Sequence, residues 1–191
     1  MSVCPTESKL EAENIYFQLF TIFENDNSIA KELAPLYGAH PFTLVRNLRT
    51  FAFKKKESTL KFIESGKQLL SKLISDYNDS PRFKVKALLL VSSDISALRI
   101  KENALFLSSL KIQALVPQLL FDFDEKQFLE YMQLDLELAD FIVVEKELDV
   151  NYIESLKKSR KEIITIDDID SIKLHALRAA LKNKNKEADY E

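Results

Sequence analysis

The sequence predicts an α/β fold, a three-layer α-β-α sandwich with an N-terminal helical extension. Helix-like and strand-like patterns alternate from residue 58 to residue 182, which is typical of a sheet that is at least partly parallel and covered by helices. The most strand-like run, residues 85–94, is apolar at consecutive positions, as expected of a strand covered on both faces. It ends in Ser-Ser-Asp, residues that suit a tight turn or a helix cap.

The first fifty residues read as the helical extension. Residues 8–24 predict a largely buried helix, because their apolar side chains are too numerous for one exposed stripe. Residues 25–28 predict a turn that caps a short helix at 29–33, and Pro35, Gly38 and Pro41 predict breaks in the chain. Residues 43–53 form a basic amphipathic segment, with Arg46 and Arg49 opposite its apolar side chains.

The α/β domain is expected over residues 51–182, followed by a disordered tail at 183–191. A charged amphipathic helix carrying Gly66 opens the domain and runs to a loop at 77–81. Pro117 cannot donate to a sheet, so the second strand should end or turn outward there. The expected order is strand 85–94, helix 95–110, strand 111–120, helix 122–136, strand 139–145, helix 150–158, strand 162–166 and helix 171–182.

The composition excludes several classes of protein. The chain has only two glycines among 191 residues, so neither GxGxxG nor GxxxxGK[ST] can be written, and we expect no nucleotide cofactor bound in these ways. A single cysteine, Cys4, excludes an intrachain disulfide framework and a cysteine-based zinc site, and we expect no metal. No apolar run approaches the roughly 20 residues that span a bilayer. Without a secretory signal pattern, we expect the protein in the cytosol or nucleus.

Charge is distributed unevenly along the chain. Residues 1–40 carry 2 basic and 6 acidic groups, residues 41–86 carry 11 and 4, and residues 87–191 carry 14 and 20. The net charges are therefore −4, +7 and −6, which sum to −3. A basic patch of this kind suits a phosphate backbone. The alternative is a solvated helix face that pairs with the acidic C-terminal half.

The stretch from Gly66 to Lys72, Gly-Lys-Gln-Leu-Leu-Ser-Lys, resembles the signature of the kink-turn RNA-binding superfamily of ribosomal and ribonucleoprotein components. In that signature a helix opens with Gly-x-Asn-(Glu)-x-x-(Lys/Arg). The resemblance implies that Gly66 lets RNA approach the backbone, that Gln68 reads base edges and that Lys72 contacts phosphate. Leu69 stands where the family has an acidic residue.

Within this superfamily the sequence is most similar to the fungal protein subunit of RNase P and RNase MRP. This resemblance implies a non-catalytic RNA-binding subunit of a ribonucleoprotein that processes tRNA or rRNA. Its partners would be structured RNA and other protein subunits, without a membrane or a cofactor, and its location the nucleus or nucleolus, with the cytoplasm as alternative. The expected RNA-binding residues are Gly66, Lys67, Gln68, Lys72, Arg46, Arg49, Lys54, Lys55 and Lys56.

Two other functions remain open at this point. One is an α/β protein-interaction module that binds no RNA and docks a partner through its acidic C-terminal half. The other is a Mg²⁺-dependent phosphatase, because Asp122-Phe-Asp124 after an apolar run resembles the nucleophile strand of haloacid-dehalogenase phosphatases. The Gly-Thr pair of that family is replaced by Glu125 and Lys126, so helix-capping carboxylates are the simpler interpretation.

Overall fold

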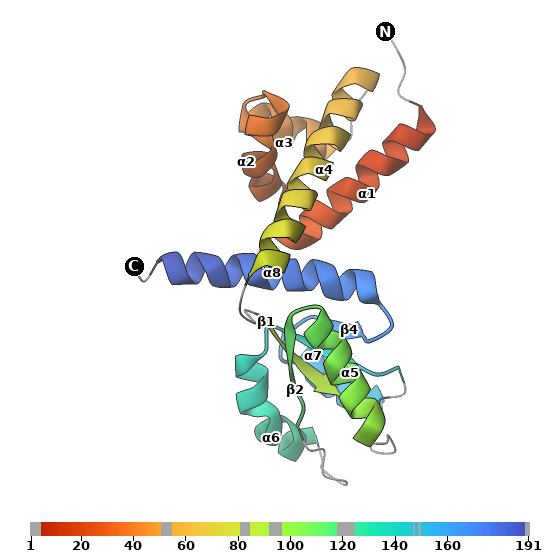
Figure 1. Cartoon of the computed structure of the whole chain (residues 1–191), viewed down its shortest axis with the longest axis vertical. Coiled ribbons are helices and arrows are strands. Elements are labelled where there is room, and N and C mark those ends of the chain that lie inside the picture. Colours follow the sequence, from red (N-terminus) through yellow and green to blue (C-terminus); the bar gives the residue numbers. More distant parts are fainter. Residues whose placement is uncertain are drawn as a thin grey trace. The chain divides into compact units, whose positions relative to one another are not determined.

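The chain forms two compact units, residues Met1–Asp79 and Ser80–Glu191. The computed structural model (Figure 1) describes residues 5–50, 55–80, 85–91, 97–117, 125–146, 148 and 150–189. The sequence predicted a boundary after residue 50, whereas the division between the two compact units falls after Asp79. The amphipathic helix that follows residue 55 buries its apolar face against the preceding helices, so it belongs to the helical unit.

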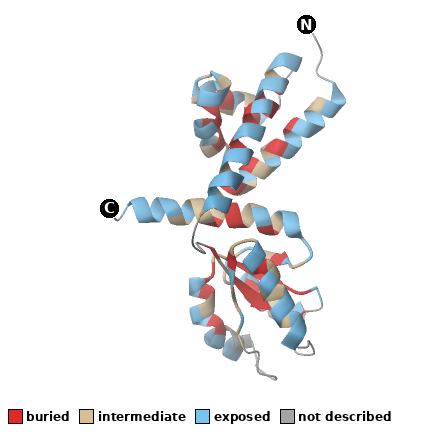
Figure 2. Ribbon diagram, viewed as in Figure 1, coloured by how far each residue is buried: buried red, intermediate tan, exposed pale blue. Residues whose placement is uncertain are grey.

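The first unit is built from four helices within the described residues. They are α1 Thr6–Phe23, α2 Asp26–Tyr37, α3 Pro41–Thr50 and α4 Lys56–Asp79. In Figure 1, α1 and α4 run side by side, and these two helices share the most extensive contact in the unit. Each helix contributes to one core, for example through Leu19, Leu33, Leu48 and Phe62, which are all fully buried. Figure 2 shows buried stretches, in red, on each of these helices.

The predicted cap of the second helix is confirmed, but the helix already begins at Asp26, so residues 26–28 are helical and not part of the turn. The Asn25 side chain accepts a hydrogen bond of 2.7 Å from the backbone N–H of Ser28, which caps α2. The helix is longer than expected, because Pro35 lies inside its last turn and does not break it. Helix α2 ends at Gly38, whose φ of 70° is a left-handed conformation that glycine adopts without steric cost.

The second unit alternates strand and helix as predicted, and its four described strands form one fully parallel sheet. The elements are β1 Val85–Leu90, α5 Ala97–Ser109, β2 Ile112–Leu115, α6 Glu125–Leu138, β3 Phe141–Val144, α7 Val150–Lys157, β4 Ile163–Thr165 and α8 Ile169–Ala188. The strand order is β2-β1-β3-β4. Leu88 at the centre of β1 is in register with Leu115 of β2 and Ile142 of β3. The predicted α/β class is therefore confirmed.

Helices cover both faces of this sheet. Leu88, Leu90 and Ile142 point to one face and pack against α6 and α7, for example against Met132 and Leu156. The alternate residues of the same strands point to the other face, where Phe141 of β3 contacts the ring of His175 in α8. Helix α5 contacts β2 and lies on that face as well, because it reaches the side chain of Glu145. Three layers result.

The last helix extends beyond its predicted end. A disordered tail was expected from Asn183, but α8 continues to Ala188. Asp140, just before β3, accepts a hydrogen bond from the backbone N–H of Lys86 at 2.8 Å and from the Asn183 amide at 3.3 Å. This hydrogen bond to Asp140 ties Asn183 to the sheet, and the helix continues past Asn183.

We predict that Ile142→Ala destabilises the protein by about 2–5 kcal/mol, the usual cost of removing a fully buried branched side chain. Ile142 lies in an inner strand between β1 and β4, where the neighbouring strands cannot collapse into the cavity. Urea denaturation followed by circular dichroism measures the change. Gln113→Ala, at an exposed position of the edge strand β2, is the control and should leave stability within about 0.5 kcal/mol. Equal effects of both substitutions would contradict the assigned core.

Candidate nucleic-acid interface

The resemblance to the kink-turn superfamily required Gly66 to lie at the start of a helix, and in the structure it does not. Helix α4 begins at Lys56 and ends at Asp79, so Gly66 lies in its interior, and it is buried. It faces α1: a Cβ atom at this position would overlap Cγ2 of Ile15 and would touch Cδ1 of Leu19 at 3.6 Å. The expectation that RNA approaches the backbone at Gly66 is therefore wrong for this structure. The missing side chain instead allows α1 and α4 to approach closely.

The neighbours of Gly66 divide between two sides of α4. Lys67 forms an ion pair with Glu11 of α1, so it lies beside the helix contact. Gln68 and Lys72 are four residues apart and therefore share a face, and both are exposed. At 100° per residue, Gln68 lies about 200° from Gly66 on the helix. The structure thus separates the glycine from Gln68 and Lys72.

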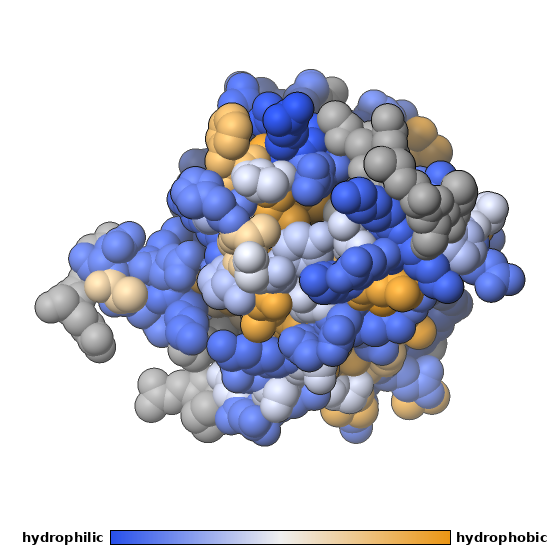
Figure 3. Space-filling view, turned by 90° about the horizontal axis from the view of Figure 1, so that it is seen from above, coloured by the Kyte–Doolittle hydropathy of each residue, from blue (hydrophilic) through white to orange (hydrophobic). Residues whose placement is uncertain are grey.

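The cationic segment (Arg46, Arg49, Lys54, Lys55 and Lys56) spans the end of α3 and the start of α4. Arg46, Arg49, Lys55 and Lys56 are exposed, and Lys54 lies outside the described residues. Residues 41–56 contain these five basic groups and no carboxylate. Figure 3 shows one face of the molecule, on which hydrophilic side chains predominate and hydrophobic ones occur in small separate groups.

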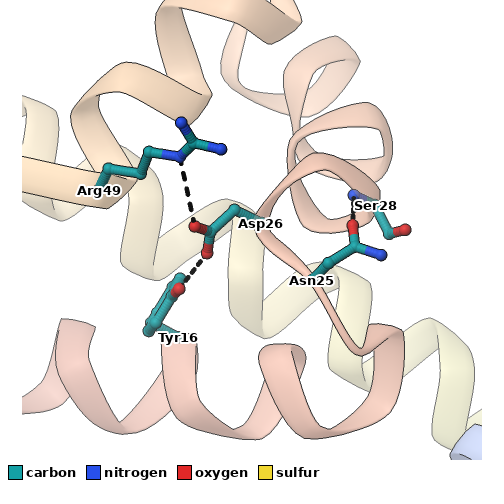
Figure 4. A network of polar contacts seen from close by, with 5 residues as sticks. All are labelled: Tyr16, Asn25, Asp26, Ser28 and Arg49. Atoms are coloured by element: carbon teal, nitrogen blue, oxygen red, sulfur yellow. Dashed lines mark hydrogen bonds and ion pairs between the residues drawn. The ribbon is translucent and has the colours of Figure 1, made fainter.

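Arg49 is also part of a polar network between three helices (Figure 4). The Tyr16 hydroxyl of α1 donates a hydrogen bond to Asp26 Oδ1 of α2, and Arg49 Nε of α3 lies 3.8 Å from Asp26 Oδ2. Burial raises the pKa of Tyr16 well above the usual range, and the hydrogen bond and negative charge of Asp26 raise it further. The Arg49 side chain remains 66% exposed, so the ion pair does not remove it from the surface.

The charges of α4 run against its helix dipole. Lys55 precedes the helix, Lys56 is its first residue, and the last turn holds no basic group. A helix N-terminus carries partial positive charge, so cations there destabilise the helix and strengthen the positive potential outside it. Glu57 in the first turn pairs with Lys61 at 3.3 Å, which offsets much of its charge. The start of α4 is therefore suited to hold an anionic group.

Sequence reasoning missed a buried carboxylate, Glu145, directly after β3. Its side chain is 2% exposed, and Oε1 accepts a hydrogen bond of 2.9 Å from Asn103 Nδ2 and lies 3.6 Å from Arg99 Nε. Its Oε2 has no hydrogen-bond partner among the described residues. The backbone N–H of Glu145 bonds to Leu90 O, so this carboxylate lies at the carboxyl ends of β1 and β3. The only signal in the sequence was a charged residue at the end of an apolar strand.

The carboxylates considered for phosphatase chemistry, Asp122 and Asp124, lie outside the part of the chain that the structure describes. Asp168, after β4, accepts a hydrogen bond of 3.2 Å from the backbone N–H of Ser171 and caps α8. Among the described residues, His, Cys, Asp and Glu side chains nowhere gather in a group of three that could hold a metal ion.

Comparisons with models of protein families, with curated proteins and with solved structures found no match for this chain. None of the helices in the described parts of the chain combines the length and the apolar character needed to cross a membrane. The assignment of the candidate interface therefore rests on the geometry and charge of its residues alone.

We predict that Gly66→Ala destabilises the helical unit by up to about 2 kcal/mol. Alanine gains about 1 kcal/mol of helix propensity, but overpacking costs about 1–3 kcal/mol, and the stiff β-branched side chain of Ile15 cannot move its Cγ2 independently. In an Ile15→Leu background, which lacks this atom, Gly66→Ala should become neutral or stabilising. Urea denaturation of the four variants measures the coupling. Gly66→Ala that stabilises the otherwise unchanged chain would disprove the close approach.

We predict that Tyr77 of α4 ionises only at strongly alkaline pH. Burial raises its pKa from 10 to about 12. Below pH 10 both folded and unfolded chains keep this proton, so Tyr77 contributes no pH dependence there. Between pH 10 and pH 12 the unfolded chain loses the proton first, so the free energy of unfolding should fall. Ultraviolet titration of tyrosinate, with Tyr77→Phe and with the urea-unfolded chain for comparison, tests this. A Tyr77 pKa near 10 in the folded protein would refute it.

Proposed function

We propose that the protein is a non-catalytic RNA-binding subunit of a ribonucleoprotein, and that the cationic segment is its main RNA contact. The observation that carries this proposal is the concentration of five basic groups and no carboxylate in residues 41–56, with the four described ones exposed. Such a segment neutralises phosphates and releases their counterions, which supplies sequence-independent affinity. The positive end of the α4 dipole adds to the same potential.

The position of Lys55 and Lys56 supports a binding role over a purely structural one. At the start of a helix these cations reduce the stability of the helix. Residues that lower stability in this way are expected at functional sites, where they contribute to binding. Gln68 and Lys72 extend the exposed polar surface along α4. Gly66 and Lys67 are not part of the proposed contact, because both face α1. Recognition then relies on phosphate contacts and RNA shape, without the base reading implied by the kink-turn signature.

The resemblance to the RNase P and RNase MRP subunit supports the kind of assembly that we propose. A chain of this type would work in tRNA or rRNA processing, in the nucleus or nucleolus, beside other protein subunits. It would position RNA and perform no chemistry. The resemblance extends to the order of helices and strands. It does not extend to Gly66, which packs against α1, whereas in the family this glycine faces RNA.

The second candidate is a protein-interaction module, and a specific feature favours it. The acidic second unit presents exposed apolar side chains at helical spacing on α6. The two functions are compatible, because the cationic segment and α6 are different surfaces of opposite charge.

We predict that Lys55→Ala/Lys56→Ala weakens RNA binding and lowers its salt dependence. Loss of two phosphate contacts should reduce the slope of log K against log[salt] by about 1.4–1.8. The measurement is a salt-titrated gel shift with a labelled transfer RNA transcript and a plain RNA duplex. The control, Lys9→Ala/Lys31→Ala, removes two exposed lysines from the same unit outside the cationic segment.

Two results would overturn the RNA proposal. One is the absence of measurable binding of the unaltered protein to either RNA at low salt. The other is a control variant that lowers the salt slope as much as the variant in the cationic segment, which would show that contacts are made by overall charge and not by this surface.

A further inference from the structure

Helix α6 is apolar on two sides, although the sheet covers only one. Met132 and Leu136 point inward and are buried against β1 and β3. On another side, Tyr131, Leu134 and Leu138 follow one another at i, i+3 and i+7 and are 43%, 66% and 48% exposed. These three residues form the α6 stripe. A soluble helix normally turns such a row toward a partner, so the stripe is a candidate contact surface.

A hollow of about 550 Å³ adjoins the stripe. Its α6 side includes Glu130, Gln133 and Glu137, which repeat the i, i+3, i+7 spacing one residue before each member of the stripe. Leu129 and Leu136 add apolar lining, and Lys158 and Lys161 lie on the side formed between α7 and β4. The outer surface of α6 therefore carries an apolar row and, directly beside it, a polar row that contains two carboxylates and opens into the hollow.

The charge of α6 selects the kind of partner. The helix contains Glu125, Glu130, Asp135 and Glu137 against one basic residue, Lys126, so its net charge is −3. Lys126 is itself engaged with Glu130 at 3.8 Å. If two copies paired through this helix, the symmetric contact would bring two −3 surfaces together, which like-charge repulsion opposes. RNA phosphates are disfavoured at this surface for the same reason.

We propose that the α6 stripe and the adjoining hollow dock a basic amphipathic helix of a partner protein. Apolar side chains of the partner, repeated at i, i+3 and i+7, cover Leu134 and Leu138. Its lysines and arginines meet Glu130 and Glu137 along the edge of the hollow. This is the helix-in-groove mode of recognition, in which the apolar row supplies affinity and the flanking charges set the orientation.

The test uses the full chain and a synthetic peptide of about 18 residues, made of leucine and lysine in an amphipathic helical pattern and labelled with fluorescein. A matched peptide carries glutamate in place of lysine. Fluorescence anisotropy should show binding of the lysine peptide and none of the glutamate peptide. Leu134→Gln/Leu138→Gln should weaken binding by about tenfold or more, because both anchors are lost. Glu130→Gln/Glu137→Gln should weaken it less and reduce its salt dependence.

The matched control is Leu98→Gln/Leu105→Gln, which alters two exposed leucines seven residues apart on α5 of the same unit. It should leave peptide affinity unchanged within about twofold, since these residues lie outside the stripe. Circular dichroism checks that every variant keeps its helix content. All of these substitutions should leave RNA binding unchanged, so failure of this proposal is distinguishable from failure of the proposed function.

Three outcomes would overturn the proposal. The first is equal binding of the lysine and glutamate peptides. The second is an α6 variant that binds the lysine peptide as well as the unaltered chain does, or a control variant that loses binding to the same extent. The third is a dimer in sedimentation velocity that dissociates on Leu134→Gln/Leu138→Gln, because a second copy would then be the occupant of the stripe.

Discussion

The close approach of α1 and α4 at Gly66 determines how the helical unit presents its surface. Without a Cβ at this position, α4 packs against Ile15 and Leu19 of α1, and the orientation of α4 about its own axis follows from that contact. Once Gly66 faces α1, the helical period fixes the direction in which every other residue of α4 points. Lys67 is drawn to Glu11, while Gln68 and Lys72 are directed to solvent. The missing side chain at Gly66 thus decides which residues of α4 face α1 and which face solvent.

Electrostatics gives the same helix a second role. The start of α4 carries lysines, and its end carries carboxylates, which is the unfavourable arrangement for a helix dipole. Because the start of a helix is itself partly positive, the lysine charges add to it and the positive potential there is stronger. Stability of the unit rests on its shared apolar core and on polar ties such as the Tyr16–Asp26 hydrogen bond. Arg49 of the cationic segment takes part in these ties through its ion pair with Asp26.

The α/β unit separates its functions differently. Its inner strands β1 and β3 are apolar at every described position apart from Lys86, and they fix the positions of the helices on both faces. At opposite ends of β3, Asp140 accepts a hydrogen bond from Asn183 of α8, and Glu145 accepts one from Asn103 of α5 and pairs with Arg99 of the same helix. Helix α6 is attached by one of its two apolar sides, which leaves the other available for a partner.

The sequence by itself determined the type and order of the elements. Short continuous apolar runs are typical of covered strands and amphipathic stretches of surface helices, and their alternation is typical of a parallel sheet with helices on both faces. It also located the cationic segment and the Asn25 cap, because these depend on residues close together in the chain. The helical character of residues 56–79 was likewise visible from their periodicity.

Only the tertiary structure decided how distant segments use these elements. Nothing local showed that Gly66 faces Ile15, that α4 belongs with the first three helices, or that Asp140 holds Asn183 in a helix. The same holds for Glu145, whose burial depends on residues of α5 more than forty positions away. Local propensity sets what a segment becomes, whereas the partner it packs against decides which of its faces is buried and which remains exposed for binding.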